Sequence, residues 1–177
     1  MIGEKLGKAM NDQIKHELES YYIYLSMAAY FESISLDGMG HWMRCQAHEE
    51  MIHAMKFFGH IIDRGGKVVL QDLKQIKTEW SSPLEVFKDA FEHEQFISSR
   101  INDLTTIARK EKEYASEPLL SWFSDEQVEE EASTGKIADQ LELVEDNKSA
   151  LLLLDRELGA RAFPPGSPFD PTAVSAG

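Results

Sequence analysis

The sequence has a single cysteine, no long apolar run and few basic residues, and each of these scarcities excludes a class of protein. With Cys45 alone, the chain can form neither an internal disulfide framework nor a CxxC metal knuckle. No apolar run reaches the roughly 18 residues that a membrane-spanning helix needs, and residues 1–20 hold no apolar core of a signal peptide. We therefore expect a cytoplasmic protein that does not enter a membrane.

Acidic residues far outnumber basic ones. Lysine and arginine number 18 against 31 aspartates and glutamates, which gives a formal net charge of −13. Because phosphate binding needs a basic face, nucleic acid is not an expected partner. An acidic surface is explained either by solubility or by attraction of cations, and composition alone leaves both open. With 42% hydrophobic residues over 177 positions, the chain suits one domain with a substantial core.

Long stretches of the chain show apolar residues at spacings of three and four, which is typical of α-helices. Short turns separate the first helix from the second and the third from the fourth, so each pair should be antiparallel. About 18 residues without a helical period, 66–83, join the two pairs, and they can span the roughly 37 Å length of a ~25-residue helix. The third helix should therefore start beside the second and run parallel to it. The expected helices cover about residues 4–33, 40–64, 83–111 and 117–146, with a short apolar helix at about 149–158.

This organisation predicts an all-α fold, a four-helix bundle with one long crossover connection and a short fifth C-terminal helix. Residues 1–160 should form the bundle and the short helix, and residues 161–177 should form an irregular tail rich in proline and glycine. The four leucines at 151–154 are too apolar for a free surface, so we expect them to be buried against other subunits or against their own subunit.

Polar side chains interrupt the core-facing positions of all four long helices at a similar depth. Each lies roughly 10–14 residues into its helix, about 15–21 Å from the start at 1.5 Å per residue. Positions near the middle of each helix meet at the middle of a bundle, whichever way the helices run, so these side chains should converge. The interrupting residues are Glu17, Glu50, Glu94, Gln127 and Glu130.

Four buried carboxylates need a compensating charge. One unpaired buried carboxylate costs several kcal/mol, and four together would rival the ~5–15 kcal/mol net stability of a domain. No lysine or arginine lies on the same helix faces at that depth, whereas two divalent cations would neutralise four negative charges. His53 follows Glu50 by three residues and adds a nitrogen ligand on the same face of its helix. The pattern therefore predicts a site for two metal ions.

Around these residues the sequence resembles the ferritins, specifically the non-haem type of bacteria and archaea. The resemblance covers nearly the whole chain and weakens in the C-terminal tail. The segment WFSDEQVEEE at 122–131 is especially close to the family's fourth helix. The resemblance implies a ferroxidase centre for two irons, with Gln127 beside it. The implied ligands are Glu17, Glu50 and His53 for one iron and Glu50, Glu94 and Glu130 for the other.

The same resemblance extends to the surroundings of this centre. Tyr24 and Trp122 match aromatic residues that flank it. Tyr24 lies two turns after Glu17 on the same helix face, within reach for electron transfer; the alternative is a core tyrosine with a bonded hydroxyl. The resemblance also implies a third iron site, whose residues are Glu49, Glu126, Glu129 and Glu130.

By this resemblance the protein is an iron-storage ferroxidase. It would oxidise Fe(II) to Fe(III) with O₂ or H₂O₂ and deposit ferric mineral inside a hollow shell of 24 identical subunits. The alternative within related families is a haem-carrying bacterioferritin, which has a second ExxH motif on the fourth helix; here Gln127 to Glu130 include no histidine. Met51 stands where a bacterioferritin places its haem-ligating methionine, but we favour a core or interface methionine and expect no haem. A helical interaction protein with protonated buried acids is an alternative of another class.

Overall fold

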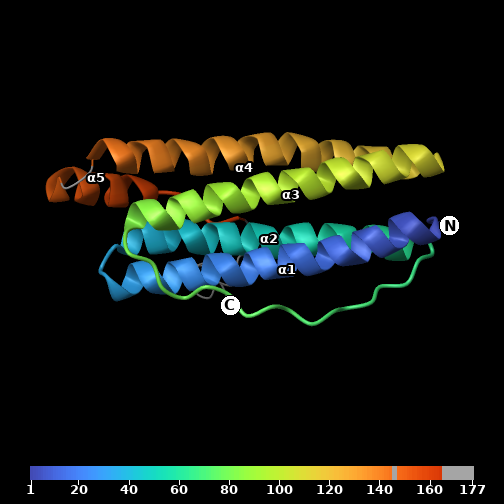
Figure 1. The fold of residues 1–177 in the computed structure, drawn as a ribbon, viewed down its shortest axis with the longest axis horizontal. Helices are drawn as coiled ribbons and strands as arrows, with labels where there is room; N and C mark the ends of the chain where they lie inside the picture. The colour runs from blue at the N-terminus through green and yellow to red at the C-terminus, as the bar shows by residue number, and fades with distance from the viewer. Residues whose placement is uncertain (145–146, 165–177) are drawn as a thin grey trace, which may run out of the picture.

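Four long helices lie side by side, and a short fifth helix packs at one end of the bundle (Figure 1). The computed structural model describes residues 1–144 and 147–164, and no strand occurs among them. The predicted all-α bundle with a short C-terminal helix is confirmed. The helices are α1 (Glu4–Ser33), α2 (Asp37–Asp63), α3 (Pro83–Glu111), α4 (Glu117–Val144) and α5 (Lys148–Leu158), with a 3₁₀ turn η1 (Tyr114–Ser116) before α4.

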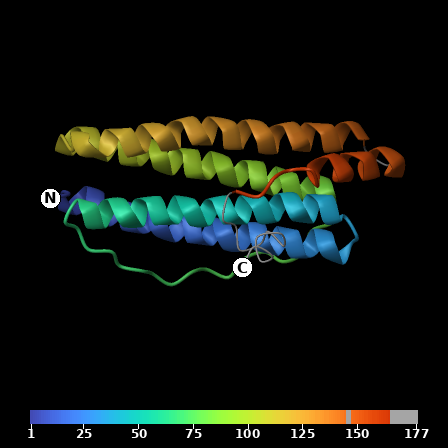
Figure 2. The same ribbon diagram turned by 180° about the vertical axis from the view of Figure 1, so that it is seen from behind.

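The long connection between α2 and α3 runs along the outside of the bundle from one end to the other (Figures 1 and 2). It returns the chain to the end where α2 begins, so α3 runs in the same direction as α2, as expected. The neighbour of α3 differs from the prediction. Its backbone packs along α1, to which it is antiparallel, rather than along α2. The spacing of apolar residues does not specify which faces of two helices meet, so this choice belongs to the tertiary packing.

A local signal explains where α3 begins. Ser82 caps α3 by accepting a hydrogen bond from the Glu85 amide at 3.1 Å, and Pro83 occupies the first turn. The prediction for α2 was about three residues too late, because Gly38 and Gly40 suggested a turn. Both glycines are helical, and Gly38 lies against α5: a Cβ atom there would come within 1.8 Å of the Asp155 carbonyl oxygen. This glycine therefore serves close helix packing.

The apolar core falls into two clusters, one toward each end of the bundle. The first includes Tyr24, Trp42 and Phe87, and the second includes Phe57 and Phe123. On each of the four long helices, a buried glutamate stands between residues of the first cluster and residues of the second. The polar side chains thus form one layer across the middle of the bundle, closed from water by apolar packing at both ends. These four glutamates are Glu17, Glu50, Glu94 and Glu130.

The short helix α5 packs against the beginning of α2. The Met39 amide donates a hydrogen bond to Asp155 Oδ1 at 2.8 Å, and Leu154 is buried in the first core cluster. Leu152 and Leu153 point outward, with 51% and 66% of their surface exposed. The apolar run at 151–154 is therefore covered only in part by its own subunit.

Residues 161–164 follow α5 without helix or strand. The rest of the predicted irregular tail, 165–177, lies outside the described residues, as do 145–146, where the fourth helix was expected to end. Across the parts of the chain that the structure describes, no helix combines the length and the hydropathy needed to cross a membrane.

Candidate metal centre

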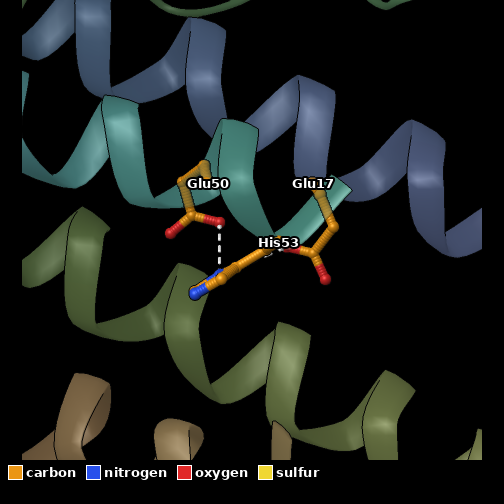
Figure 3. Close-up of side chains that lie close together, drawn as sticks. All are labelled: Glu17, Glu50 and His53. Atoms are coloured by element: carbon orange, nitrogen blue, oxygen red, sulfur yellow. Dashed lines mark ion pairs between the residues drawn. The ribbon is translucent and has the colours of Figure 1, made fainter. Parts of the chain in front are cut away.

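Three buried side chains from α1 and α2 meet at the spacing of metal ligands (Figure 3). Glu50 and His53 lie three residues apart on one face of α2, and Glu17 faces them from α1. His53 Nδ1 is 3.5 Å from Glu50 Oε2 and 4.0 Å from Glu17 Oε2. One ligand atom from each of the three residues lies within 4.8 Å of the others. The three ligand atoms are thus close enough together to bind one cation.

Two carboxylate oxygens of this group lack a hydrogen-bond donor in the part of the chain that the structure describes. They are Glu17 Oε2 and Glu50 Oε1, and both are shielded from solvent. A buried acceptor without a donor is costly, and native structures rarely leave one without a reason. Hard oxygen donors with one imidazole nitrogen suit iron and similar divalent ions. The orphaned oxygens therefore fit a metal ion as the missing partner.

Burial and mutual repulsion disfavour the ionised forms of these acids. Burial, together with the nearby Glu50 carboxylate, raises the pKa of Glu17 well above its ordinary value. Burial raises the pKa of Glu50 in the same way, with Glu94 and Glu130 adding to the effect. The pKa of Glu130 rises to about 8 through burial first and the Glu94 carboxylate second. Two divalent cations in this layer would lower these pKa values and so favour the ionised carboxylates.

Glu94 and Glu130 approach this group from α3 and α4. The Tyr24 hydroxyl donates to Glu94 Oε1, and the Gln127 amide nitrogen donates to Glu94 Oε2 at 3.1 Å. Two oxygens of one carboxylate are thus held by two neutral donors. Burial raises the pKa of the Tyr24 hydroxyl, with the Glu94 charge as the next cause, so the phenol stays a donor. Tyr24 is fully buried with its hydroxyl bonded.

Two glutamines in the same layer had no role in the sequence analysis. Gln13 Nε2 donates to Glu17 Oε1 at 2.9 Å, and Gln46 Nε2 donates to Glu130 Oε2 at 2.6 Å. Both are fully buried. The sequence held one signal for them, since each lies one helical turn before a buried glutamate of its own helix. The partner of Gln46 lies on another helix, so that contact was not predictable from spacing.

The acids of the expected third site lie beside this layer, between α2 and α4. Glu49 and Glu126 are partly buried and Glu129 is exposed. Together with Glu130 they line a cavity of about 180 Å³. The cavity is also lined by Arg161, a residue that the sequence analysis did not connect with any site.

Trp122, on α4, packs against the centre through its contact with His53. Its ring packs edge to face on the His53 imidazole, with ring centres 5.5 Å apart. Lys56 Nζ lies 4.0 Å above the same indole. Trp122 is thus a direct neighbour of one expected ligand and restricts the orientation of that imidazole.

A family model described as a ferritin-like domain matches residues 7–144. Together with the helical bundle and its buried carboxylate and histidine group, this match defines the class: a ferritin-like protein. The chain is similar to a bacterial non-heme ferritin of Bacteroides fragilis, 42% identical over 161 residues, 91% of this chain and 100% of that relative. It is also similar to one of Staphylococcus aureus, 39% identical over 163 residues, 92% of this chain and 98% of that relative.

Solved structures agree with these relatives. A humanized archaeal ferritin shares 48% sequence identity at a TM-score of 0.92, covering 93% of this chain and 100% of the other. An open-pore ferritin of the hyperthermophilic archaeon Archaeoglobus fulgidus shares 46% identity at a TM-score of 0.90, covering 92% and 100%. The chain therefore belongs to the ferritins, in the non-haem group of bacteria and archaea. Membership of this family supports iron binding and iron storage in general terms.

Proposed function

We propose that this protein is an iron-storage ferroxidase that oxidises Fe(II) at a two-iron centre within each subunit. One observation carries the proposal: a layer of four buried glutamates, closed by apolar clusters on both sides, in which Glu17, Glu50 and His53 stand at ligand spacing. Buried acids of this number have no structural benefit without a cation. Iron is the substrate here and passes through the site.

The ligand set suggests which residues bind each of the two irons. Glu17, Glu50 and His53 would bind one Fe(II), and Glu50 would share the second with Glu94 and Glu130. Each iron supplies one electron, so a pair reduces O₂ with two protons to H₂O₂ and leaves two Fe(III). With H₂O₂ as the oxidant, the same pair and two protons yield two water molecules. Binding of Fe(II) at neutral pH would displace protons from carboxyls whose pKa values are raised, such as Glu130.

Gln13, Gln46 and Gln127 would orient the ligands of this centre. Each donates an N–H to one oxygen of a ligand carboxylate, and at Glu17 this leaves the second oxygen, Oε2, for the metal. Neutral donors suit this role because a lysine or arginine would compete with iron for the same charge. Supporting groups of this kind commonly decide how well a metal ligand is placed.

The acids beside the centre would form the third iron site. Glu49, Glu126 and Glu129 are more solvent-accessible than the centre and share Glu130 with it. Such a site suits iron that is arriving or leaving, because its carboxylates can be rehydrated at lower cost than buried ones. We propose that ferric iron moves through it toward a mineral core.

Storage of a mineral requires an enclosed space, and we propose a shell of 24 subunits. The family assignment supports this assembly. The outward-facing Leu152 and Leu153 support it too, because exposed leucines beside each other on a short helix favour burial against another subunit. The cytoplasmic location expected from the sequence stays a prediction.

The test is rapid-mixing oxidation of Fe(II) by Glu50→Ala and His53→Ala variants. Each should lose the fast oxidation phase and keep the helical circular-dichroism spectrum, because each removes a ligand without leaving an unpaired charge. Glu92→Ala is the matched control, an exposed glutamate on α3 two residues before Glu94. A wild-type rate in either variant would show that the centre lies elsewhere.

A further inference from the structure

The chain after α5 turns back along α2 (Figure 2), and Arg161 in this segment lines the acidic cavity. Arg161 Nη2 donates to Glu49 Oε2 at 2.5 Å. The Arg161 guanidinium also lies over the indole of Trp42, with its central carbon 4.6 Å from the ring centre. The contact with Glu49 joins residues 112 apart in the sequence, and the contact with Trp42 joins residues still farther apart.

The backbone around Arg161 is anchored to α2 independently of its side chain. His41 Nε2 donates to the Arg161 carbonyl oxygen at 2.6 Å. The Phe163 ring packs edge to face on the same imidazole, with centres 4.5 Å apart. The segment is therefore held even when the guanidinium leaves Glu49. We name residues 159–164 the C-terminal strap.

Among the described residues that line the cavity, Arg161 is the one cationic side chain. Its charge acts on both Glu49 and Glu130, and so on both the outer acids and the buried layer. The pair with Glu49 is partly exposed, with side-chain exposures of 25% and 28%. Ion pairs exposed to this degree are weak and exchange readily.

The bond of Arg161 to Glu49 is also incomplete. Arg161 Nη1 is shielded from solvent and has no hydrogen-bond partner within residues 1–144 and 147–164. Guanidinium binds a carboxylate best through two parallel bonds, and here the structure has one. Stacking on Trp42 would persist if Glu49 turned toward a metal ion, because that contact does not involve the carboxylate.

We propose that Arg161 is a tethered counter-cation that occupies Glu49 until a metal ion displaces it. The proposal rests on the third iron site of the proposed function and adds a residue that sets its affinity. With no metal present, the guanidinium offsets part of the cavity's negative charge. When a divalent or trivalent cation enters, it competes with Arg161 for Glu49, so the site binds iron more weakly than its acids alone would. Weak binding suits a place that iron must leave.

The test uses Zn²⁺, which is not oxidised, in calorimetric titrations of the metal-free assembled protein. Arg161→Gln removes the charge and keeps a side chain of moderate length. We expect Zn²⁺ affinity at the weakest site to rise about two- to fivefold, in line with the loss of a partly exposed ion pair. Arg161→Lys keeps a cation without the planar group and should lie between wild type and Arg161→Gln. Arg156→Gln, at an exposed arginine of α5, is the control and should change nothing.

A double-mutant cycle with Glu49→Gln identifies the residue through which Arg161 acts. In the Glu49→Gln background, Arg161→Gln should raise Zn²⁺ affinity much less, because only the weaker effect of its charge on Glu130 remains. Equal affinity in wild type and Arg161→Gln would overturn the proposal. So would an equal rise in the presence and absence of Glu49, which would indicate a general charge effect.

A different result of the same titrations would refute the third iron site itself. If wild type and Glu49→Gln bind the same number of Zn²⁺ ions with the same affinities, no third site involves Glu49, and the role of Arg161 fails with it. If they differ and Arg161→Gln still equals wild type, the third site stands and only the counter-cation fails. Loss of the ferroxidase centre is detected independently by the fast Fe(II) oxidation phase.

Discussion

Replacing Glu130 with glutamine should make the metal-free protein more stable and the metal-loaded protein relatively less so. The Glu130 carboxyl is buried, and its pKa rises from the ordinary 4.5 to about 8, by burial first and by repulsion from Glu94 second. A carboxyl with a raised pKa favours the folded state only while it is protonated. Its contribution is complete below about pH 4.5 and is lost as the pH rises through about 8.

The magnitude follows from the same two values. In the unfolded chain Glu130 has its ordinary pKa, and pH 7 lies about 2.5 pH units above it, so the carboxyl is ionised. In the folded protein it is mostly protonated at this pH. Each pH unit corresponds to ~1.4 kcal/mol, so the free energy of unfolding falls by roughly 3 kcal/mol. Glutamine cannot ionise, and its carbonyl oxygen can still accept the N–H of Gln46. Glu130→Gln should therefore raise the free energy of unfolding by up to about 3 kcal/mol at pH 7 and change it little near pH 4. For a chain of this size, that corresponds to a rise of roughly 6–12 °C in the midpoint.

The assay is thermal unfolding of the metal-free protein across pH 4–8 at one scan rate, because large assemblies often unfold irreversibly. Glu92→Gln, at an exposed glutamate, is the control. Saturating Zn²⁺ should then stabilise wild type more than Glu130→Gln, since the variant has lost a charged ligand. A difference between wild type and Glu130→Gln that stayed constant from pH 4 to pH 8 would refute the reasoning.

Three further outcomes are expected. Tyr24→Phe should still bind two Fe(II) per centre but oxidise them several-fold more slowly in rapid mixing, because the hydroxyl that holds Glu94 is gone; an unchanged rate would leave Tyr24 a purely structural role. Gly38→Ala should lower the thermal midpoint by several degrees, because its Cβ would collide with the Asp155 carbonyl and push α5 away from α2. An unchanged midpoint would show that α5 can move away without loss of stability. The purified protein should show no Soret band, and a stoichiometric band lost in Met51→Leu would instead favour the bacterioferritin interpretation.

Much of the fold and of the candidate site follows from short-range patterns in the sequence. Helix extents are local properties, set by periodic apolar residues and by signals such as Ser82 before Pro83, so they were predictable to within a few residues. The depth of Glu17 and Glu50 along their helices is also local, and it places both in the middle layer. The cost of burying such charges made a metal site the expected reason for them. Their assignment as iron ligands stays a prediction.

Tertiary structure alone decided which side chains meet across the bundle. The packing of α3 along α1 depends on how the helix faces fit together, and the close approach of α5 to Gly38 in the first turn of α2 depends on the path of the chain after α4. The bond between Gln46 and Glu130 joins residues 84 apart, and the bond between Arg161 and Glu49 joins residues 112 apart. Helical spacing constrains neighbours within a few residues, whereas partners this distant are fixed by the rotation of each helix and by the path of the chain after α5. The sequence therefore determined the helices and the charges at their centres, and the packing determined the donors and the counter-cation that surround them.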